Sequence, residues 1–313
     1  MIRIENYELS YRTIWNEFVR SSKNGTFLFD RDYMDYHADR FVDHSLMFFD
    51  DNRLVAILPA NLSDNVLISH GGLTFGGLII DQKMTMRLMM DIFSELRVYS
   101  LKLGISRIIY KAIPHIYHRL PAEEDLYALF FHRAHLYRRD VSSTIELSNK
   151  LPYTKGRRGC IKKALANGVF VQQTQDFDKF MEIDEEHLRE KHNKRPVHTA
   201  SEMHLLAGRF PQNIQLYGAY RDGVMLGGVV LYIADMVVHA QYIAATAEGK
   251  TLSALDAILD YLINDRFRNK RYFDFGISTD HGGQVLDQNL VANKESFGAR
   301  TTVYDFYEWD LKK

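Results

Sequence analysis

Hydrophobic side chains recur along the chain at two spacings, and the first spacing predicts helices. Apolar residues three and four positions apart form one face of a helix that packs on a core. In residues 253–267 that face contains Leu255, Ile258, Leu259, Leu262 and Ile263. Similar spacing, or a glycine that ends a helix, predicts further helices at residues 11–22, 84–104, 156–168 and 176–192.

The second spacing consists of short apolar runs between turn-forming residues, and it predicts strands. In the first half of the chain these runs form a hairpin around the sequence DDNR, within residues 45–62, and a further strand at residues 106–114. In the second half they form three consecutive strands within residues 213–246 and a last one at residues 271–278.

Each half therefore has the same order: a hairpin or meander, an amphipathic helix and a strand. We interpret this order as a tandem duplication of one α/β (α+β) unit. The turn-rich segment SNKLPYTKG, residues 148–156, is the expected join. The predicted domains are residues 1–150 and residues 151–313, packed as one rigid body.

Composition narrows the functional classes. Hydrophobic residues make up 46% of the 313 residues, charged residues 25%, and the formal net charge is -1, so no overall charge attracts DNA. The single cysteine, Cys160, excludes an intramolecular disulfide and a cysteine metal cluster. No apolar run is long enough to span a membrane, and the charged amino terminus MIRIENYELSYR is unlike a signal peptide. We expect a cytoplasmic protein.

Four segments resemble the acyl-CoA N-acyltransferase (GNAT) fold, and specifically its FemAB-like branch with two tandem domains. They are RRGCIKKALANGVFV (157–171), YGAYRDGVMLGGVVLY (217–232), YFDFGIS (272–278) and NKESFGA (293–299). The resemblance covers nearly the whole chain. It implies two GNAT-like domains, each with a mixed, mostly antiparallel sheet flanked by helices, and it implies a bacterial acyltransferase.

The sequence departs from the family pattern in two places. The long helical arm found in many members that use aminoacyl-tRNA is absent. The loop that binds acetyl-CoA is usually glycine-rich, whereas the matching ATAEGKTLSA has one glycine, Gly249. In the resemblance this loop holds the donor, which assigns Gly249, Lys250, Thr251 and Ser253 to an acyl-CoA. Ser253 and Asp256 fit a capping box, so an ordinary capped helix is the alternative.

Three residues are candidates for catalysis. Asp274 lies among aromatic residues on a predicted strand and is either a general base or a structural hydrogen-bond acceptor. His281 follows in the loop TDHGGQ and is either a base for an amine or a mobile surface histidine. In the resemblance, Lys294 of NKESFGA matches a lysine near the reacting centre, where it would stabilise an oxyanion or hold a phosphate. The alternative is a solvent-facing lysine.

Four further residues are candidates for substrate binding. Lys155, Arg158 and Lys162 share one face of a predicted helix without an acidic residue nearby, so Arg158 and Lys162 are expected to contact an anionic group. In the strand VVHAQYIAA, alternation places His239 with Gln241 on one face and Tyr242 on the other. Either face is suited to line a cleft, and His239 is alternatively a core residue.

These features predict an N-acyltransferase that requires no metal. It would move an acyl group, from acetyl-CoA or another acyl-CoA, to an amine of a sugar, a sugar-nucleotide or a cell-envelope precursor, as in polysaccharide biosynthesis. The first alternative is an aminoacyl-tRNA-dependent transferase for a peptidoglycan precursor; the missing arm and near-neutral charge disfavour tRNA as a partner. The second alternative is a non-catalytic tandem domain that binds a nucleotide-linked sugar.

Overall fold

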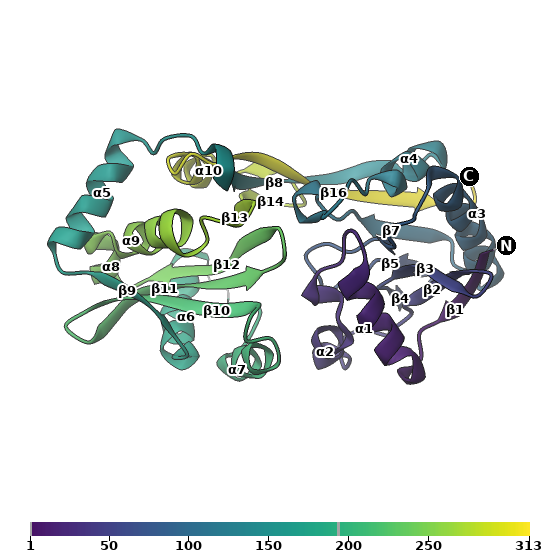
Figure 1. Cartoon of the computed structure of the whole chain (residues 1–313), viewed down its shortest axis with the longest axis horizontal. Coiled ribbons are helices and arrows are strands. Elements are labelled where there is room, and N and C mark those ends of the chain that lie inside the picture. The colour runs from purple at the N-terminus through teal and green to yellow at the C-terminus, as the bar shows by residue number, and fades with distance from the viewer. Residues whose placement is uncertain (1, 193–194) are drawn as a thin grey trace. The chain divides into compact units, whose positions relative to one another are not determined.

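The computed structural model describes residues 2–192 and 195–313, and the chain divides into two compact units (Figure 1). The first unit contains Met1–Val141, Thr279–Val285 and Val303–Lys313, and the second contains Ser142–Ser278 and Leu286–Thr302. This division differs from the predicted boundary at residue 150. The chain leaves the first unit inside a strand, and the carboxyl-terminal strand belongs to the first unit rather than the second.

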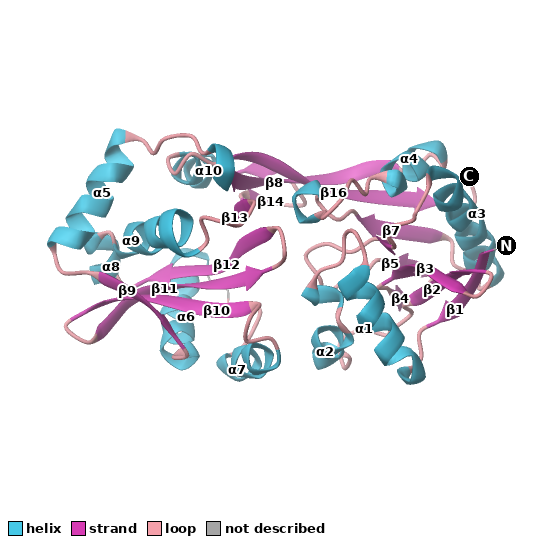
Figure 2. Cartoon of the chain, in the orientation of Figure 1, coloured by secondary structure: helices cyan, strands magenta, loops and turns pink. Residues whose placement is uncertain are grey.

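The first unit combines a four-stranded sheet, further paired strands and helices, coloured by type in Figure 2. Its described strands are β1 (Ile2–Asn6), β2 (Leu46–Asp50), β3 (Arg53–Leu58), β4 (Asn61–Ser63), β5 (Val66–Ile68), β6 (Ile79–Ile80), β7 (Arg107–Lys111) and β14 (Thr279–Asp280). Its described helices are α1 (Arg12–Ser21), α2 (Arg31–Met34), α3 (Met86–Lys102) and α4 (Glu124–Phe131), with 3-10 turns at Leu9–Tyr11, Phe27–Phe29, Asp35–His37 and His115–Tyr117. The strand order is β1-β2-β3-β6 in one sheet.

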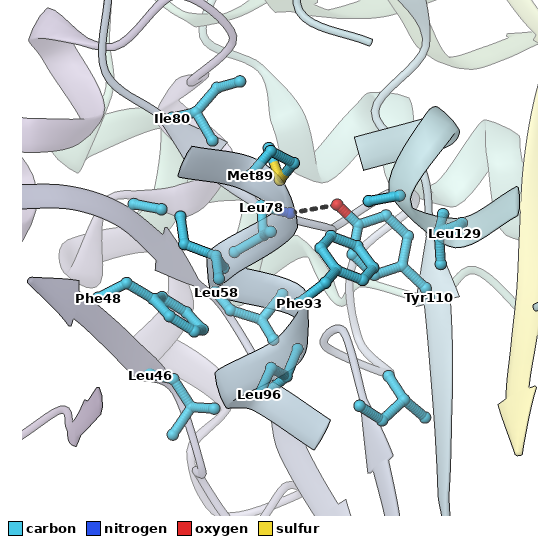
Figure 3. Close-up of a cluster of buried hydrophobic side chains, with 14 of the residues drawn as sticks. Leu46, Phe48, Leu58, Leu78, Ile80, Met89, Phe93, Leu96, Tyr110 and Leu129 are labelled. Atoms are coloured by element: carbon cyan, nitrogen blue, oxygen red, sulfur yellow. Dashed lines mark hydrogen bonds between the residues drawn. The ribbon is translucent and has the colours of Figure 1, made fainter. Parts of the chain in front are cut away.

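The core of the first unit explains why the last strand, β16 (Arg300–Asp310), returns to it. Residues Phe306–Asp310 of β16 pair antiparallel with β7. This pairing places Trp309 in the same buried cluster as Phe93 of α3, which is drawn in Figure 3. At the centre of that cluster the Tyr110 hydroxyl accepts a hydrogen bond from the Leu78 amide (2.7 Å) and donates one to Asp125 (2.6 Å).

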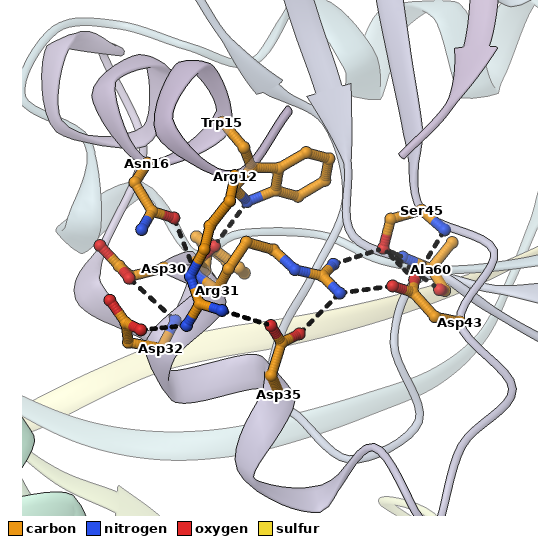
Figure 4. Close-up of polar contacts among 11 residues, drawn as sticks. Arg12, Trp15, Asn16, Asp30, Arg31, Asp32, Asp35, Asp43, Ser45 and Ala60 are labelled. Carbon is orange, nitrogen blue, oxygen red and sulfur yellow. Dashed lines mark hydrogen bonds and ion pairs between the residues drawn. The ribbon is translucent and has the colours of Figure 1, made fainter. Parts of the chain in front are cut away.

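A buried arginine organises the polar side of the first unit (Figure 4). Arg31 is 4% exposed, and its guanidinium lies 3.8 Å from the centre of the Tyr7 ring. It pairs with Asp35 at 2.7 Å and with Asp43, and it donates to the Ser45 hydroxyl at 3.3 Å. Because a buried cation is costly without such partners, these contacts fix the segment around α2 against the residues that lead into β2.

The second unit is one curved sheet with helices on both faces. Its strands are β9 (Phe170–Thr174), β10 (Ile214–Arg221), β11 (Val224–Ile233), β12 (Val237–Ala245) and β13 (Tyr272–Ile277), together with the end of β8 (His135–Glu146); β15 (Val285–Leu286) lies at the unit boundary. Its helices are α5 (Lys155–Ala166), α6 (Phe177–His192), α7 (Ala200–Arg209), α8 (Ala247–Leu252), α9 (Ala254–Tyr261) and α10 (Gln288–Glu295), with a 3-10 turn at Leu147–Asn149 and a π-helical turn at Leu262–Arg266. The order is β8-β13-β12-β11-β10-β9, and only β12 and β13 run parallel.

The two faces of this sheet are covered by different helices. Val229 and Leu231 of β11 lie in one buried cluster with Ile258 of α9. Gly228, which points the other way, lies against Phe180 of α6, because a Cβ added to it would stand 2.7 Å from the Phe180 ring. Alternate residues of β11 therefore contact α9 and α6 in turn.

The helix predicted at residues 253–267 is present as α9 and the π-helical turn that follows it, but its predicted cap is wrong. Ser253 has a φ of 61° and separates α8 from α9, and its side chain caps neither helix. The cap is Thr246, whose hydroxyl accepts a hydrogen bond from the Gly249 amide at 3.0 Å. Asp256, the predicted partner of Ser253, pairs instead with Arg157 of α5.

Two glycines with opposite surroundings test this packing. A Cβ built on Gly159 of α5 meets no described atom within 4 Å, so Gly159→Ala should raise the free energy of unfolding by about 0.5–1 kcal/mol. A Cβ on Gly249 would lie 2.0 Å from the Leu226 carbonyl oxygen, so Gly249→Ala should lower the free energy of unfolding. Urea denaturation measures both changes, and equal effects of the two substitutions would contradict the packing described for α8.

Candidate functional site

The central feature of the second unit is a split between two parallel strands. β12 and β13 pair through Val237–Tyr272, Val238–Phe273 and His239–Asp274, which is the last pair between them in the part of the chain that the structure describes. Beyond Asp274 the pairing of β13 with β8 shifts register, and Gly276 adopts a φ of 77°. The two strands therefore separate directly after His239 and Asp274.

Asp274 and His239 form a hydrogen-bonded dyad at this point. The Asp274 side chain is fully buried, and its Oδ2 lies 2.7 Å from His239 Nδ1. Its Oδ1 accepts hydrogen bonds from the hydroxyls of Ser142 (2.6 Å) and Thr144 (2.9 Å), both on β8. The carboxyl group thus has a donor from each neighbouring strand.

These contacts determine the protonation state of the dyad. Burial alone would raise the pKa of Asp274, but the hydrogen bond and charge of His239, with the two hydroxyls, hold this pKa below its usual value. An ionised Asp274 only accepts hydrogen bonds, so His239 Nδ1 must be the donor. In neutral His239 the lone pair is then on Nε2, and the side chain remains 14% exposed.

The structure explains why a glycine occupies position 276, within the YFDFGIS segment. A Cβ at Gly276 would lie 3.2 Å from His239 Cε1, in addition to the strain of a positive φ. A larger residue would therefore press on the imidazole that Asp274 orients.

A β-bulge corrects the predicted faces of β12. The register between β11 and β12 shifts between Val230 and Leu231, so that Tyr232 pairs with His239 and Val230 pairs with Tyr242. Because Val230 and Tyr232 alternate onto the same face of β11, His239 and Tyr242 share a face, contrary to the prediction from simple alternation.

Tyr242 belongs to a second buried polar group on this face. Its hydroxyl forms a short hydrogen bond with His198 Nδ1, and burial, followed by the nearby Tyr232 and Asp184, raises the pKa of Tyr242. Asp184 of α6 is 3% exposed, and its Oδ2 has no hydrogen-bond partner among the described residues. Burial raises the pKa of Asp184 to about 6.

A cavity of about 380 Å³ lies beside the split and contains most of the predicted donor residues. Its apolar walls are Ile243, Leu255, Leu259, Phe275, Leu290 and Phe297. Its polar or glycine positions are Arg157, His187, Gly249, Lys250, Ser253, Asp256, Asn293 and Lys294. Apolar walls combined with converging polar groups are typical of small-molecule sites.

Lys294 is buried rather than solvent-facing, with 6% exposure. Its ammonium donates to the carbonyl oxygens of Gly276 (2.8 Å) and Ile277 (2.9 Å) and to the Ser278 hydroxyl (2.8 Å). Burial lowers the pKa of Lys294 to about 8, against the opposing effects of Asp274 and Asp287. The lysine thus satisfies strand groups that are exposed when β13 leaves β12.

The residues predicted to bind the donor differ in whether they line the cavity. Gly249, Lys250 and Ser253 line the cavity, but Gly249 is also required by its close approach to Leu226. Thr251 does not appear in the cavity lining, and its hydroxyl donates to the Ala247 carbonyl at 3.0 Å.

The predicted basic face lies on α5. Arg158 and Lys162 are exposed, and Arg158 donates to the Tyr153 carbonyl. The neighbouring Arg157 points inward, where it pairs with Asp256 and donates to the Ser296 hydroxyl. His281 belongs to the first unit, in an exposed turn with a φ of 50°.

Sequence reasoning missed Ser142 and Thr144, the hydroxyl partners of Asp274. Ser142 and Thr144 are two positions apart in the run DVSSTIEL, so alternation places their hydroxyls on one strand face. This pattern was the sequence signal from which these residues could have been predicted. Among the residues described, no group of three or more His, Cys, Asp or Glu side chains is arranged to bind a metal ion. No helix in the described ranges is both long and apolar enough to cross a bilayer.

Comparisons with known proteins agree with this architecture. Residues 154–282 match the family model for an acetyltransferase (GNAT) domain. FemX has a similar structure, with a TM-score of 0.68 and 10% sequence identity over 96% of each chain. L-PGS from Bacillus licheniformis has a TM-score of 0.62 and 11% identity, covering 99% of this chain and 94% of that protein.

A tandem GNAT protein from the clavulanic acid biosynthesis pathway is similar over 99% of each chain, with a TM-score of 0.51 and 11% identity. No curated protein matches the sequence. At such identities the structural likeness concerns the fold. It confirms the predicted mixed α/β fold of GNAT type and the resemblance to FemAB-like proteins, and the family match identifies an acyltransferase domain.

The buried carboxyl of Asp184 leads to a prediction on pH dependence. Its pKa in the folded chain, about 6, lies above the unfolded value, so the folded state holds the extra proton and stability falls as the pH rises from about 4 to 6. In Asp184→Asn this contribution disappears. Across that window the parent should lose roughly 2–3 kcal/mol of unfolding free energy relative to the variant.

Urea denaturation at several pH values measures this difference. Glu186→Gln, which alters an exposed carboxyl on the same helix, serves as the control and should follow the parent curve. Parallel curves for the parent and Asp184→Asn would contradict a raised pKa at Asp184.

Proposed function

Because residues 154–282 match a GNAT acetyltransferase domain, we propose that the second unit transfers an acyl group to an amine, with His239 as the general base. The observation that supports this proposal is the His239–Asp274 dyad, where β12 and β13 separate beside a cavity. Asp274 acts as a positioning residue in this scheme. It holds the imidazole through Nδ1 and leaves Nε2 to accept a proton.

The proposed reaction requires one proton acceptor and one leaving group. The amine nitrogen forms a bond to the acyl carbonyl carbon, and His239 Nε2 accepts the amine proton. The bond between that carbon and the donor sulfur or oxygen then breaks, and the leaving atom receives the proton from His239. The buried negative charge of Asp274 stabilises the imidazolium between these steps.

The cavity fits an acyl-CoA donor, which supplies the activated acyl group. Ile243, Leu259, Phe275 and Phe297 provide apolar walls for its flexible arm and acyl chain, and Lys250 is an exposed cation at the lining. The backbone of the loop is less suited to hold the phosphates of this donor. The Gly249 amide is used by the Thr246 cap, and Glu248 places a carboxylate in the same turn.

Lys294 has a different place in this proposal from the one the family motif implies. Each of its three contacts is a strand or side-chain oxygen, so its hydrogen bonds serve β13. Its positive charge still lines the cavity. We assign it to hold the split open and to contribute charge, rather than to donate a hydrogen bond to the reacting oxygen.

The proposed acceptor is an amine on a sugar, a sugar-nucleotide or a cell-envelope precursor. The exposed Arg158 and Lys162 of α5 would contact an anionic part of such a molecule. The likeness to FemX and to L-PGS keeps an ester-linked aminoacyl group as the alternative donor, because the same base serves either leaving group.

The test is a direct assay of the purified chain. Acyl-CoAs of different chain length are offered with amino sugars and their nucleotide conjugates, and free thiol release is followed together with the mass of the product. We expect an amide product that contains the acyl group. Product formed only from an aminoacyl-tRNA would establish the alternative donor, and no product from either donor would overturn the proposal.

The dyad gives a kinetic prediction. His239→Gln removes the base and should lower kcat by about 10²-fold or more, with a smaller change in KM. Asp274→Asn should also lower kcat, because its amide does not enforce the donor role of Nδ1.

Asp222→Asn changes a carboxyl in an exposed turn, with 90% exposure, and is the matched control. Circular dichroism and the melting temperature exclude misfolding as the cause. Parent-like kcat in both dyad variants would show that His239 is a structural residue.

Lys294→Met tests the assignment of this lysine. Its loss leaves three acceptors without their buried donor, so the free energy of unfolding should fall by about 1–3 kcal/mol and kcat should fall with it. Lys250→Met, at an exposed lysine of the same cavity, should leave stability nearly unchanged. Reduced kcat with full stability in Lys294→Met would instead indicate a direct catalytic contact.

A further inference from the structure

A second cavity of about 380 Å³ lies in the second unit, at the opposite end of β11 from the cavity that contains the predicted donor residues. One of its walls is Ile233, the last residue of β11, whereas the donor cavity contains Gly249, which packs on Leu226 near the start of that strand. Seven residues of an extended strand separate these points by roughly 23 Å. The two cavities share no lining residue.

The guanidinium of Arg266 is held in place at this cavity. Arg266 ends the π-helical turn, an irregular turn that often occurs at functional positions. Its Nε donates to the Tyr217 hydroxyl at 2.8 Å, and that hydroxyl donates to Gln215 Oε1 at 3.1 Å. The guanidinium also lies over the Phe267 ring, 4.8 Å from its centre.

The terminal nitrogens of Arg266 are available to a ligand. The contacts of Arg266 within the described ranges are those with Tyr217 and Phe267, and no described carboxylate forms an ion pair with it. An arginine whose Nε is occupied and whose plane is fixed by a ring presents its two remaining NH₂ groups with little further loss of freedom.

Lys270 supplies a second positive charge to the same lining. Its ammonium donates to the carbonyl oxygens of Ala234 (2.7 Å) and Asp235 (3.1 Å), which leaves one N–H without a contact in the part of the chain described. The other polar lining residues are the amides Gln212, Gln215 and Asn269. The nearby carboxyls of Asp235 and Asp265 do not line the cavity, so its lining has two cations and no anion.

We propose that this cavity binds the phosphate group of a small phosphomonoester, with Arg266 and Lys270 as its cationic partners. A planar guanidinium fork matches two phosphate oxygens, and an ammonium supplies a third contact. The amides of Gln212 and Asn269 offer donors and acceptors to the rest of the molecule, and the volume is that of a small-molecule site. This site is separate from the proposed transfer reaction and does not depend on it.

The test is isothermal titration calorimetry of the full chain at constant ionic strength. The probes are AMP, glucose 6-phosphate and inorganic phosphate, with adenosine, glucose and acetate as probes that lack the phosphate. We expect saturable binding of one phosphomonoester per chain and none of the probes without phosphate. Arg266→Gln should weaken this binding by about 10-fold or more, and Lys270→Gln should weaken it by a smaller factor.

Three variants complete the experiment. Arg268→Gln removes the same charge from an exposed neighbour outside the lining and should leave the Kd unchanged. Lys250→Gln, in the donor cavity, should also leave it unchanged. Arg266→Lys keeps the positive charge but lacks the planar guanidinium, and should give an intermediate Kd. This variant still tests the role of Arg266 if Arg266→Gln fails to fold. The proposal is overturned if no phosphomonoester binds saturably, if Arg266→Gln and Arg266→Lys bind as the parent does, or if only Lys250→Gln weakens binding.

Discussion

One buried negative charge organises the second unit. The fully buried Asp274 carboxyl would be costly to ionise without partners, and it obtains them from the two strands beside it. Ser142 and Thr144 reach it from β8, and His239 reaches it from β12. The contacts that keep this carboxyl ionised therefore also join three strands and fix the imidazole. The stability of the sheet and the geometry of the candidate site depend on the same hydrogen bonds.

The separation of β12 from β13 creates a second requirement. A strand that leaves its neighbour exposes backbone oxygens that need donors. Lys294 meets this requirement with contacts to Gly276, Ile277 and Ser278, and the positive φ of Gly276 lets the strand turn away. The NKESFGA segment and the YFDFGIS segment are thus two halves of one local arrangement, although 14 residues separate them.

Periodicity predicted the regular elements well, because the buried faces of α3 and α9 are set by local spacing. The family motif led to Lys294, and the aspartate among aromatics led to Asp274. Predictions from residue spacing were wrong where a single residue breaks the regular alternation of a strand or the start of a helix. The bulge in β12 moved Tyr242 onto the face of His239, and the left-handed Ser253 moved the cap to Thr246. The partners of Asp274 were missed since Ser142 and Thr144 are distant in sequence and chemically ordinary.

The path of the chain between the units has a consequence for synthesis. The first unit takes its final strand from Val303–Lys313, so this unit is incomplete until these residues have been translated. Trp309 and Leu311 fill its core, and without them the emerging chain exposes β7 and the apolar face of α3. By contrast, the second unit has all of its residues before residue 303. A nascent chain on the ribosome therefore has the means to fold the later unit before the earlier one is closed, the reverse of the usual order from the amino terminus.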